Sequence, residues 1–407
     1  MKILLTQASV YVPSHGGANK ENRLMLEALA KLGHVCSAVV PACGVQAARS
    51  AEAFHQELNA RGIRYEQQPD ADIFRHNGVE VTAVRDRSMI CARLAREIAE
   101  TRPDVVLVAS EDPGQVLLDA AMRSDSRSVA YVARTTLALP FGPAGLGGSA
   151  RGVELLRRVN GILALSHYLR RYFREWAGLE ATVLPLSFHG PGPFPDLGSY
   201  DHGFITMVNP CEYKGLSIFA AMARACPDLT FAVAPTWGTT TKDLELIRTS
   251  NIRILAPVDD IDEILSVARV LVMPSLWAEA RGRTITEAML RGIPVIASDV
   301  GGVREAKLGV EYLLPVCPIV SFANRLDERM LPVPIVPEQD VQPWIGALRE
   351  LLSSEVTYRR ISQQSREAAQ AANENETAGP LEEYLRRVAA SSRPASSPAA
   401  AGAEGRA

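Results

Sequence analysis

The sequence predicts an α/β protein with two doubly wound parallel-sheet domains that face each other across a cleft. Three observations lead to this fold class. Short apolar runs alternate with amphipathic segments of helix length along most of the chain, a pattern typical of parallel sheets covered by helices. The alternation stops at residues 186–203, where Gly and Pro are too frequent for a regular element. Finally, 407 residues exceed the size at which a single hydrophobic core keeps growing.

The first part of the chain is expected to form a domain over residues 1–190, followed by a linker at 191–203. Short apolar runs predict buried strands at Lys2–Leu5, His34–Val40, Val105–Ala109, Ser128–Val132 and Gly161–Leu165. Apolar residues at helical spacing predict helices at Glu21–Leu32, Arg87–Thr101 and Gln115–Met122. Because helices separate the strands, we expect the strands to pair in parallel.

The same alternation resumes in a second predicted domain, over residues 204–355. Its expected strands are Phe204–Val208, Thr230–Ala234, Asn251–Ala256, Val270–Met273 and Pro294–Ala297. Helical patterns follow at Pro343–Ser353, Thr357–Ala372 and Pro380–Ala389, and we expect those in 356–390 to return to the first domain. Residues 391–407 are nearly all Ala, Ser, Pro and Gly, so this tail lacks the apolar residues that offset ordering entropy and is expected to be disordered.

Composition narrows the class of protein. The formal net charge of −3 argues against nucleic acid as a partner, because binding phosphate backbones needs a cationic surface. The six cysteines are scattered without a C-x-x-C pair, which predicts reduced, buried thiols in a cytoplasmic protein. The N-terminal MKILLTQASV turns polar too soon for a signal peptide, and no apolar run approaches the ~20 residues of a membrane helix. We expect a monomer or a homodimer.

The stretch WAEARGRTITEAMLRGIPVIASDVGG places two carboxylates, Glu279 and Glu287, eight positions apart. A helix is expected at Arg283–Arg291, and its first amides, at Gly282–Thr284, form an anion site of the kind that binds phosphate. Carboxylates on either side suit sugar hydroxyls, because each oxygen accepts hydrogen bonds. The pattern therefore predicts a nucleotide sugar as ligand. The alternative is a solvated helix face with incidental charges.

A second segment, MVNPCEYKGLSIF, points to the same ligand. A strand is expected to end at Val208, and Lys214 then opens a helix together with Gly215. A lysine at such a corner would face the anion from the opposite wall of the cleft. Taken alone, this feature also fits an ordinary surface lysine at a helix start.

The E-x7-E spacing, the Lys-Gly corner and the later GGVRE resemble the retaining glycosyltransferases of family 4, over roughly residues 1–390. The resemblance implies the GT-B fold: two Rossmann-like domains, the first binding the acceptor and the second a nucleotide-diphosphate sugar. It implies hexosyl transfer to a hydroxyl with retention, with Glu279 near the transferred sugar, Glu287 on the ribose and Lys214 on the diphosphate. UDP-sugars are favoured by their frequency in the family.

No metal or other cofactor is expected. The D-x-D pattern of metal-dependent transferases occurs at Asp70/Asp72 and Asp260/Asp262, away from the Lys214 and Glu279 segments. We expect cationic side chains and helix dipoles to stabilise the departing diphosphate instead. None of the histidines has metal-ligand spacing.

The sequence departs from the family at one position. Family members usually carry an Arg five residues before the corner lysine, where this chain has Asn209, and a neutral amide cannot replace a guanidinium electrostatically. We hypothesise that Arg283 supplies the missing charge, with Arg281 or Arg134 as substitutes. Other donor-side candidates are Thr284, Trp237 and Gly238, the last two in a loop near the diphosphate where Trp237 could equally be a structural plug.

The acceptor side is predicted less sharply. Gly16 and Gly17 follow the first strand and match the family's glycine loop opposite the donor, although a plain tight turn is the alternative; His15 precedes them. Further cleft candidates at strand ends are Glu111 and the Arg134-Thr135 pair, which stands where family members often carry a histidine.

Several alternatives stay open. The acceptor could be a glycan, a lipid, a thiol precursor or a natural product, the last mildly preferred. An epimerase of the same fold, or a catalytically degenerate nucleotide-sugar-binding protein, would have a similar cleft. The amphipathic segment 168–176 carries aromatic residues on one face and arginines on the other, which fits core packing or peripheral contact with a membrane.

Overall fold

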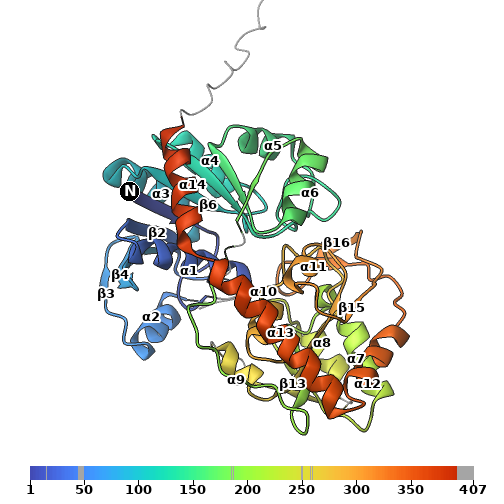
Figure 1. Cartoon of the computed structure of the whole chain (residues 1–407). Coiled ribbons are helices and arrows are strands. Elements are labelled where there is room, and N and C mark those ends of the chain that lie inside the picture. Colours follow the sequence, from blue (N-terminus) through green and yellow to red (C-terminus); the bar gives the residue numbers. More distant parts are fainter. Residues whose placement is uncertain are drawn as a thin grey trace, which may run out of the picture.

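The computed structural model describes residues 1–14, 16–44, 50–184, 186, 188–248, 251–256, 258 and 260–391. Two sheets, the first mostly and the second wholly parallel in the described pairs, are each flanked by helices and lie one beyond the other, with the first and second halves of the chain kept apart (Figure 1). The predicted fold class is confirmed. His15 and residues 392–407 of the predicted tail lie outside the described residues.

The first sheet has nine strands in the order β3-β4-β5-β2-β1-β6-β7-β8-β9. Its strands are β1 Lys2–Thr6, β2 Val35–Pro41, β3 Tyr65–Gln67, β4 Ala71–His76, β5 Val79–Val84, β6 Val105–Ala109, β7 Val129–Ala133, β8 Gly161–Ala164 and β9 Thr182–Val183. Its helices are α1 Gly17–Lys31, α2 Ala51–Ala60, the 3-10 turn η1 Arg87–Met89, α3 Ile90–Thr101, α4 Val116–Arg123, α5 Ala150–Arg157 and α6 His167–Ala177. Strands β6 and β7 are buried at every position, as expected for a sheet covered on both faces.

One edge of this sheet differs from the prediction. Strands β3, β4 and β5 pair antiparallel, although β5 still pairs in parallel with β2. The turn between β4 and β5 is Asn77-Gly78, and both residues adopt positive φ angles of 47° and 84°. That dipeptide is a strong hairpin signal, but no strand was expected there.

The second sheet has six strands in the order β12-β11-β10-β13-β14-β15, and all the pairs described are parallel. Its strands are β10 Phe204–Val208, β11 Phe231–Ala234, β12 Ile252–Ile254, β13 Ala268–Met273, β14 Val295–Ser298 and β15 Leu313–Leu314. The accompanying helices are η2 Glu212–Lys214, α7 Leu216–Ala225, α8 Thr241–Ile247, α9 Ile261–Leu265, α10 Arg283–Leu290, α11 Val303–Ala306, α12 Gln342–Leu351 and α13 Glu355–Asn375. A separate antiparallel hairpin, β16 Phe322–Leu326 and β17 Pro332–Pro334, was not expected.

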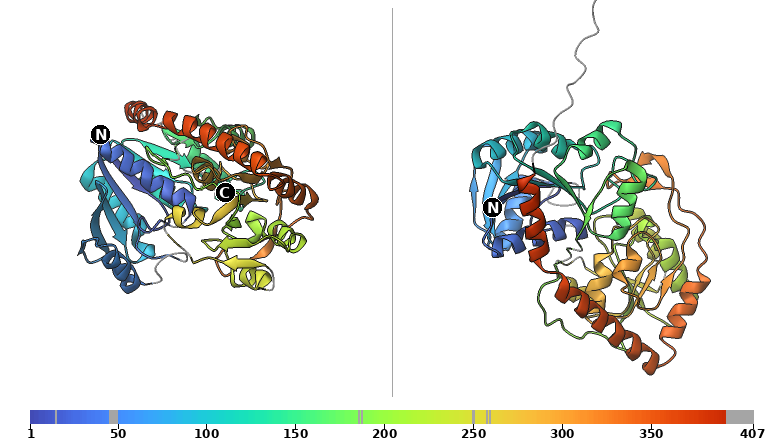
Figure 2. Two further views of the ribbon diagram at one scale, coloured as in Figure 1. Left: turned by 60° about the horizontal axis from the view of Figure 1, so that its bottom comes forward. Right: turned by 45° about the horizontal axis from the view of Figure 1, so that its top comes forward.

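The chain passes between the two sheets twice, once in the segment before β10 and once between α13 and α14 (Ala378–Ala390) (Figures 1 and 2). Helix α13 packs against α10 of the second sheet, whereas α14 packs against α1 and β6 of the first. Leu381, Tyr384 and Leu385 of α14 join the hydrophobic cluster that contains Ile3 and Leu5 of β1. The last helix is thus part of the first core.

Helix α6 contains the whole aromatic segment 168–176. Leu169, Tyr172 and Phe173 are buried in the core of the first sheet, while Trp176 is 47% exposed. Among the described residues, no helix has both the length and the apolar character to cross a bilayer. The six cysteines are free, but the prediction that all are buried is wrong for three of them. Cys43 and Cys91 are only partly buried, and Cys317 is exposed in the loop ahead of β16.

One buried charge gives a prediction about stability. The Lys307 side chain is 1% exposed, and its Nζ donates to the Val295 carbonyl at 2.6 Å. Burial lowers the pKa of Lys307 from its usual 10.5 to about 7, with the Glu311 carboxylate opposing the shift. Between these values the folded protein has released a proton that the unfolded chain still holds, so the stability of the folded state rises with pH.

We therefore expect Lys307→Met to be more stable than the parent at about pH 6, and its advantage to shrink by up to ~1.4 kcal/mol per pH unit above about pH 7. Calorimetric unfolding of both proteins at several pH values measures the difference. A stability gap that does not change with pH would contradict the lowered pKa.

Candidate functional site

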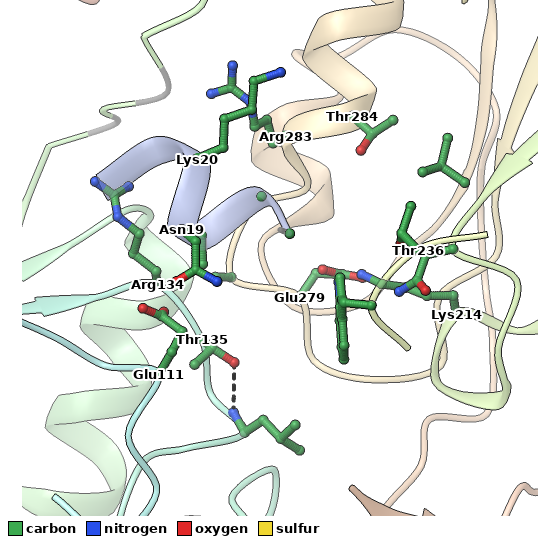
Figure 3. Close-up of a pocket in the computed structure, with 18 of the residues that line it drawn as sticks. Asn19, Lys20, Glu111, Arg134, Thr135, Lys214, Thr236, Glu279, Arg283 and Thr284 are labelled. Carbon is green, nitrogen blue, oxygen red and sulfur yellow. Dashed lines mark hydrogen bonds and ion pairs between the residues drawn. The ribbon is translucent and has the colours of Figure 1, made fainter. Parts of the chain in front are cut away.

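A cavity of about 510 Å³ lies between the two halves of the molecule. It opens at the carboxyl ends of the parallel strands, because residues following β1, β6, β7, β10, β11 and β13 all line it. This is where open α/β sheets place their ligands. Figure 3 shows Glu111, Arg134 and Thr135 on one side and Lys214, Thr236 and Glu279 on the other.

The cavity brings together almost all the residues singled out from the sequence. Those that line it are Gly16, Gly17, Glu111, Arg134, Thr135, Asn209, Lys214, Trp237, Glu279, Arg281, Gly282, Arg283, Thr284 and Glu287. Gly238 does not line it; its N–H donates to the Asn209 Oδ1 at 3.0 Å. His15 is outside the described residues.

Lys214 and Glu279 form an ion pair at the centre of one wall. Glu279 is 6% exposed, and its Oε1 also accepts a hydrogen bond from Ser275 Oγ at 2.5 Å. The Lys214 ammonium lies 4.8 Å from the centroid of the Trp277 ring, a cation–π contact. The two charges that sequence reasoning assigned separately to diphosphate and sugar are therefore immediate neighbours.

The glycines of the Lys-Gly corner and of GGVRE are explained by close packing. Gly215 has a φ of 77°, and a Cβ there would overlap the carbonyl oxygen of Pro274. Gly301 and Gly302 pack in the same way against the backbone of Glu279 and Ala280, and Gly302 N donates to the Glu279 carbonyl at 2.8 Å. The Lys-Gly corner and the GG of GGVRE thus let separate loops approach closely enough to fix Lys214 and Glu279.

The first half of the chain also holds the Glu279 loop. Thr136 Oγ1 donates to the Ala278 carbonyl at 2.8 Å, and Ser166 Oγ donates to the Ala280 carbonyl at 2.6 Å. Glu305, from GGVRE, accepts from the backbone N–H groups that open α6. The position of Glu279 therefore depends on contacts between both halves of the molecule.

Arg283 lies at the start of α10 beside Lys20 of α1 (Figure 3). Its Nε donates to Glu287 at 2.8 Å, and its Nη1 lies 3.7 Å from Glu21. Glu21 in turn pairs with Arg134 at 2.9 Å. These alternating charges link the two halves of the molecule across one end of the cavity.

The two substitutes for Arg283 are both bound to protein groups. Arg281 pairs at 2.7 Å with Glu376, at the break between α13 and α14. The Arg134 side chain has no exposed surface and is bonded to Glu21, Asn22, Met25 and the Leu186 carbonyl. Burial lowers the pKa of Arg134, although Glu21 and Glu111 oppose this. Arg134 therefore serves the packing between segments. Arg281 differs, because its Nε and Nη1 are buried at the cavity and have no hydrogen-bond partner among the described residues.

Asn209 has a left-handed backbone, with φ of 61°, and its side chain is buried. Its Oδ1 accepts from Gly238 N and Thr239 Oγ1, which fixes the loop that carries Trp237. Its Nδ2 has no hydrogen-bond partner among the described residues, although it is buried at the cavity. An unpaired buried donor needs an explanation, and a ligand oxygen would provide one.

The polar face of α1 was missed by sequence reasoning. The expected helix started at Glu21, but α1 starts at Gly17, so Asn19 and Lys20 belong to it and line the cavity. Lys20 Nζ lies 3.9 Å from Glu287 Oε1, and burial lowers the pKa of this lysine. The signal was present as ANKEN, a polar run directly after two glycines.

Gly16 and Glu111, both predicted from the sequence, make close contacts at the cavity. Gly16 has φ of 83°, and a Cβ there would lie 3.2 Å from Cδ1 of Trp237, so the glycine loop of one half touches the loop of the other. Glu111 accepts from Ser110 Oγ at 2.9 Å and from Asn22 Nδ2 at 3.3 Å. Burial raises the pKa of Glu111, against these hydrogen bonds and the nearby Arg134.

The D-x-D carboxylates have other partners. Asp70 pairs with Arg93 and Arg96, and Asp72 with His55 and Arg85. Asp260 caps α9, and Asp262 pairs with Arg291.

The fold is that of the GT-B glycosyltransferases. Three solved structures match nearly the whole chain, and at their low sequence identities these matches show a shared fold. Sucrose-phosphate synthase from Thermosynechococcus elongatus is 16% identical, with a TM-score of 0.67, over 95% of this chain and 98% of that one. A glycosyltransferase from Rickettsia africae is 15% identical, with a TM-score of 0.63, over 96% of this chain and 99% of that one. Anabaena HepE in complex with UDP-glucose is 17% identical, with a TM-score of 0.64, over 95% of this chain and 98% of that one.

The sequence itself matches a family over part of its length. Residues 204–330, which span most of the second sheet, match the model of the family described as Glycosyl transferases group 1. No curated protein matches the chain. The family match and the fold support a glycosyltransferase.

Proposed function

We propose that this protein is a retaining glycosyltransferase of family 4 that moves a hexosyl group from a nucleotide-diphosphate sugar to an acceptor hydroxyl without a metal ion. The observation that supports this proposal most strongly is the charge of the cavity, which is cationic although the chain has a net charge of −3. Among the described residues that line it, the cations are Lys20, Arg87, Arg134, Lys214, Arg281, Arg283 and Arg329, and the carboxylates are Glu21, Glu111, Glu279 and Glu287.

The diphosphate binds between Lys214 and the amino end of α10. The free amides there and the helix dipole favour an anion, and Gly282, with φ of 107°, lets the backbone approach it. Asn209 Nδ2 supplies a further donor, and Arg283 supplies charge from α10. A bound anion would compete with Glu279 for the Lys214 ammonium. The carboxylate oxygens of Glu279 would then be available to the sugar.

The two glutamates hold the ends of the donor, Glu279 on hydroxyls of the transferred sugar and Glu287 on the ribose. The bond between the sugar C1 and the phosphate oxygen breaks as the acceptor oxygen bonds to C1 from the same face. The acceptor proton goes to the departing phosphate oxygen, so no separate base is needed. Lys214 and the α10 amides stabilise the growing negative charge. The products are a glycoside and a nucleoside diphosphate.

The test is incubation with UDP-, ADP- and GDP-sugars and a mixture of hydroxylated acceptors, with and without a chelator. We expect one donor to release nucleotide at a rate that the chelator leaves unchanged, and a glycoside with the donor's anomeric configuration. Inversion, or loss of turnover in the chelator, would contradict the mechanism. Donor conversion without glycoside would indicate an epimerase, and binding without turnover a degenerate protein.

A further inference from the structure

The lining of the cavity is apolar next to the Lys214–Glu279 pair. Leu137, Leu146, Trp277 and Leu331 all line it, and all belong to or pack against one hydrophobic cluster. Trp277 is also the ring under the Lys214 ammonium. An apolar surface therefore adjoins the place where the donor sugar would be held. We call these four residues and Met330 the apolar wall.

Both halves of the molecule build this wall. Leu137 and Leu146 come from the loop after β7, which is tied by a backbone hydrogen bond of 2.8 Å from Leu146 N to the Leu137 carbonyl. Leu331 and Met330 come from the turn between β16 and β17. The hairpin thus reaches the cavity, although it belongs to neither large sheet.

The turn of the hairpin is held in one shape. Asp327 Oδ1 accepts from Arg329 N at 2.8 Å and from Leu331 N at 2.9 Å, and Asp327 N donates to the Leu331 carbonyl at 2.8 Å. Arg329 Nε also donates to the Thr239 carbonyl at 3.0 Å, and Glu328 accepts from Thr241 N at 2.8 Å. These bonds fasten the turn to the loop that follows β11.

This rigid turn presents Met330. Met330 has a positive φ of 60° and is 62% exposed, yet it lines the cavity. A left-handed backbone costs a non-glycine residue roughly 1–2 kcal/mol, so the surrounding bonds must maintain it. A methionine held in this way offers an adaptable apolar contact to a ligand.

The nucleobase of the donor has a different place. Ile261 and Ile264 of α9 also line the cavity, and α9 is joined to α10 by the pair between Asp262 and Arg291. The Arg291 Nη1 donates to the Glu287 carbonyl at 2.9 Å, so this second apolar surface lies at the Glu287 end. The apolar wall, beside Glu279, is left for the acceptor.

We infer that the apolar wall binds the acceptor, and that the acceptor carries an apolar body beside its reacting hydroxyl. Met330 is then a specificity-determining residue. This inference rests on the proposed function, because it takes Glu279 as the sugar end of the donor. A free saccharide would leave its hydroxyl groups without partners against these side chains.

The test compares Met330→Gln with Leu326→Gln and Ile335→Gln. One control ends β16 and the other directly follows β17; they are similarly exposed, at 53% and 55%, but do not line the cavity. Umbelliferone serves as the probe with an apolar body and maltose as the saccharide. We expect Met330→Gln to raise the acceptor KM for umbelliferone by about tenfold, with donor KM and acceptor-independent donor hydrolysis unchanged and both controls like the parent.

Binding of umbelliferone without donor, measured by equilibrium dialysis, keeps this inference separate from the proposed function. If no donor turns over, weaker binding to Met330→Gln than to the controls still supports the apolar wall. Equal binding by all variants, no umbelliferone binding by the parent, or maltose as the better acceptor would overturn the inference.

Discussion

Lys214→Met should slow donor turnover by two to three orders of magnitude, the usual cost of removing one donor that stabilises a developing anion. The variant loses the cation that lies against both Glu279 and Trp277 in the cavity wall. It also leaves the buried Glu279 with Ser275 but without its ion pair, which weakens the orientation of the carboxylate. Nucleotide release under saturating donor measures the effect.

Lys242→Met is the matched control, because that lysine is exposed on α8, pairs with Glu212 and does not line the cavity. It should retain the parent rate. Glu279→Gln should also be slow, and the double variant should be little worse than either single variant, because the two side chains act as a unit. Parental rates for a folded Lys214→Met would remove the basis of the proposed mechanism.

Gly215→Ala should reduce stability and turnover together. The Cβ would overlap the Pro274 carbonyl oxygen, and the φ of 77° is strained for alanine. Left-handed strain of about 1–2 kcal/mol and overpacking of about 1–3 kcal/mol together predict a loss of roughly 2–5 kcal/mol. Any relief of the overlap moves Lys214 relative to the loop that carries Glu279. Calorimetry and donor turnover measure the two effects.

Gly62→Ala separates strain from overlap. Gly62 has a similar φ of 67°, but nothing lies within 4 Å of its added Cβ. This control should lose only the strain energy, roughly 1–2 kcal/mol, and keep its turnover. Equal losses in the two variants would show that the contact with Pro274 has no role.

The buried strands and the site motifs could be read from local patterns. β6 begins and ends where the apolar run does, because a strand buried on both faces needs an unbroken apolar run. β10 also has its expected bounds, although Thr206 interrupts its apolar run. The donor-side motifs were equally local, since Lys214 and Glu279 both follow strands that end at one edge of a sheet. The β16–β17 hairpin was not predicted, because its short strands are at most partly buried over most of their length and their apolar pattern is weak.

The partners of the charges could not be predicted in the same way. Arg283 was expected to supply the charge missing at Asn209, and the structure shows that it also contacts Glu287 one turn away and Glu21 from a distant helix. Arg281 pairs with Glu376, which lies almost a hundred positions further along the chain. Spacing in sequence specifies which side chains share a helix face, whereas pairing between segments depends on how the two sheets meet.

The sequence by itself determined the two sheets, the helix that begins at Arg283 and the residue types at the ends of the strands, because burial and turn chemistry act over a few residues. Only the tertiary structure decided that Lys214 is bonded to Glu279, that α1 contributes Lys20, and that a hairpin brings Met330 to the cavity. These arrangements join segments far apart in the chain, and their geometry is set by the packing of whole layers against each other.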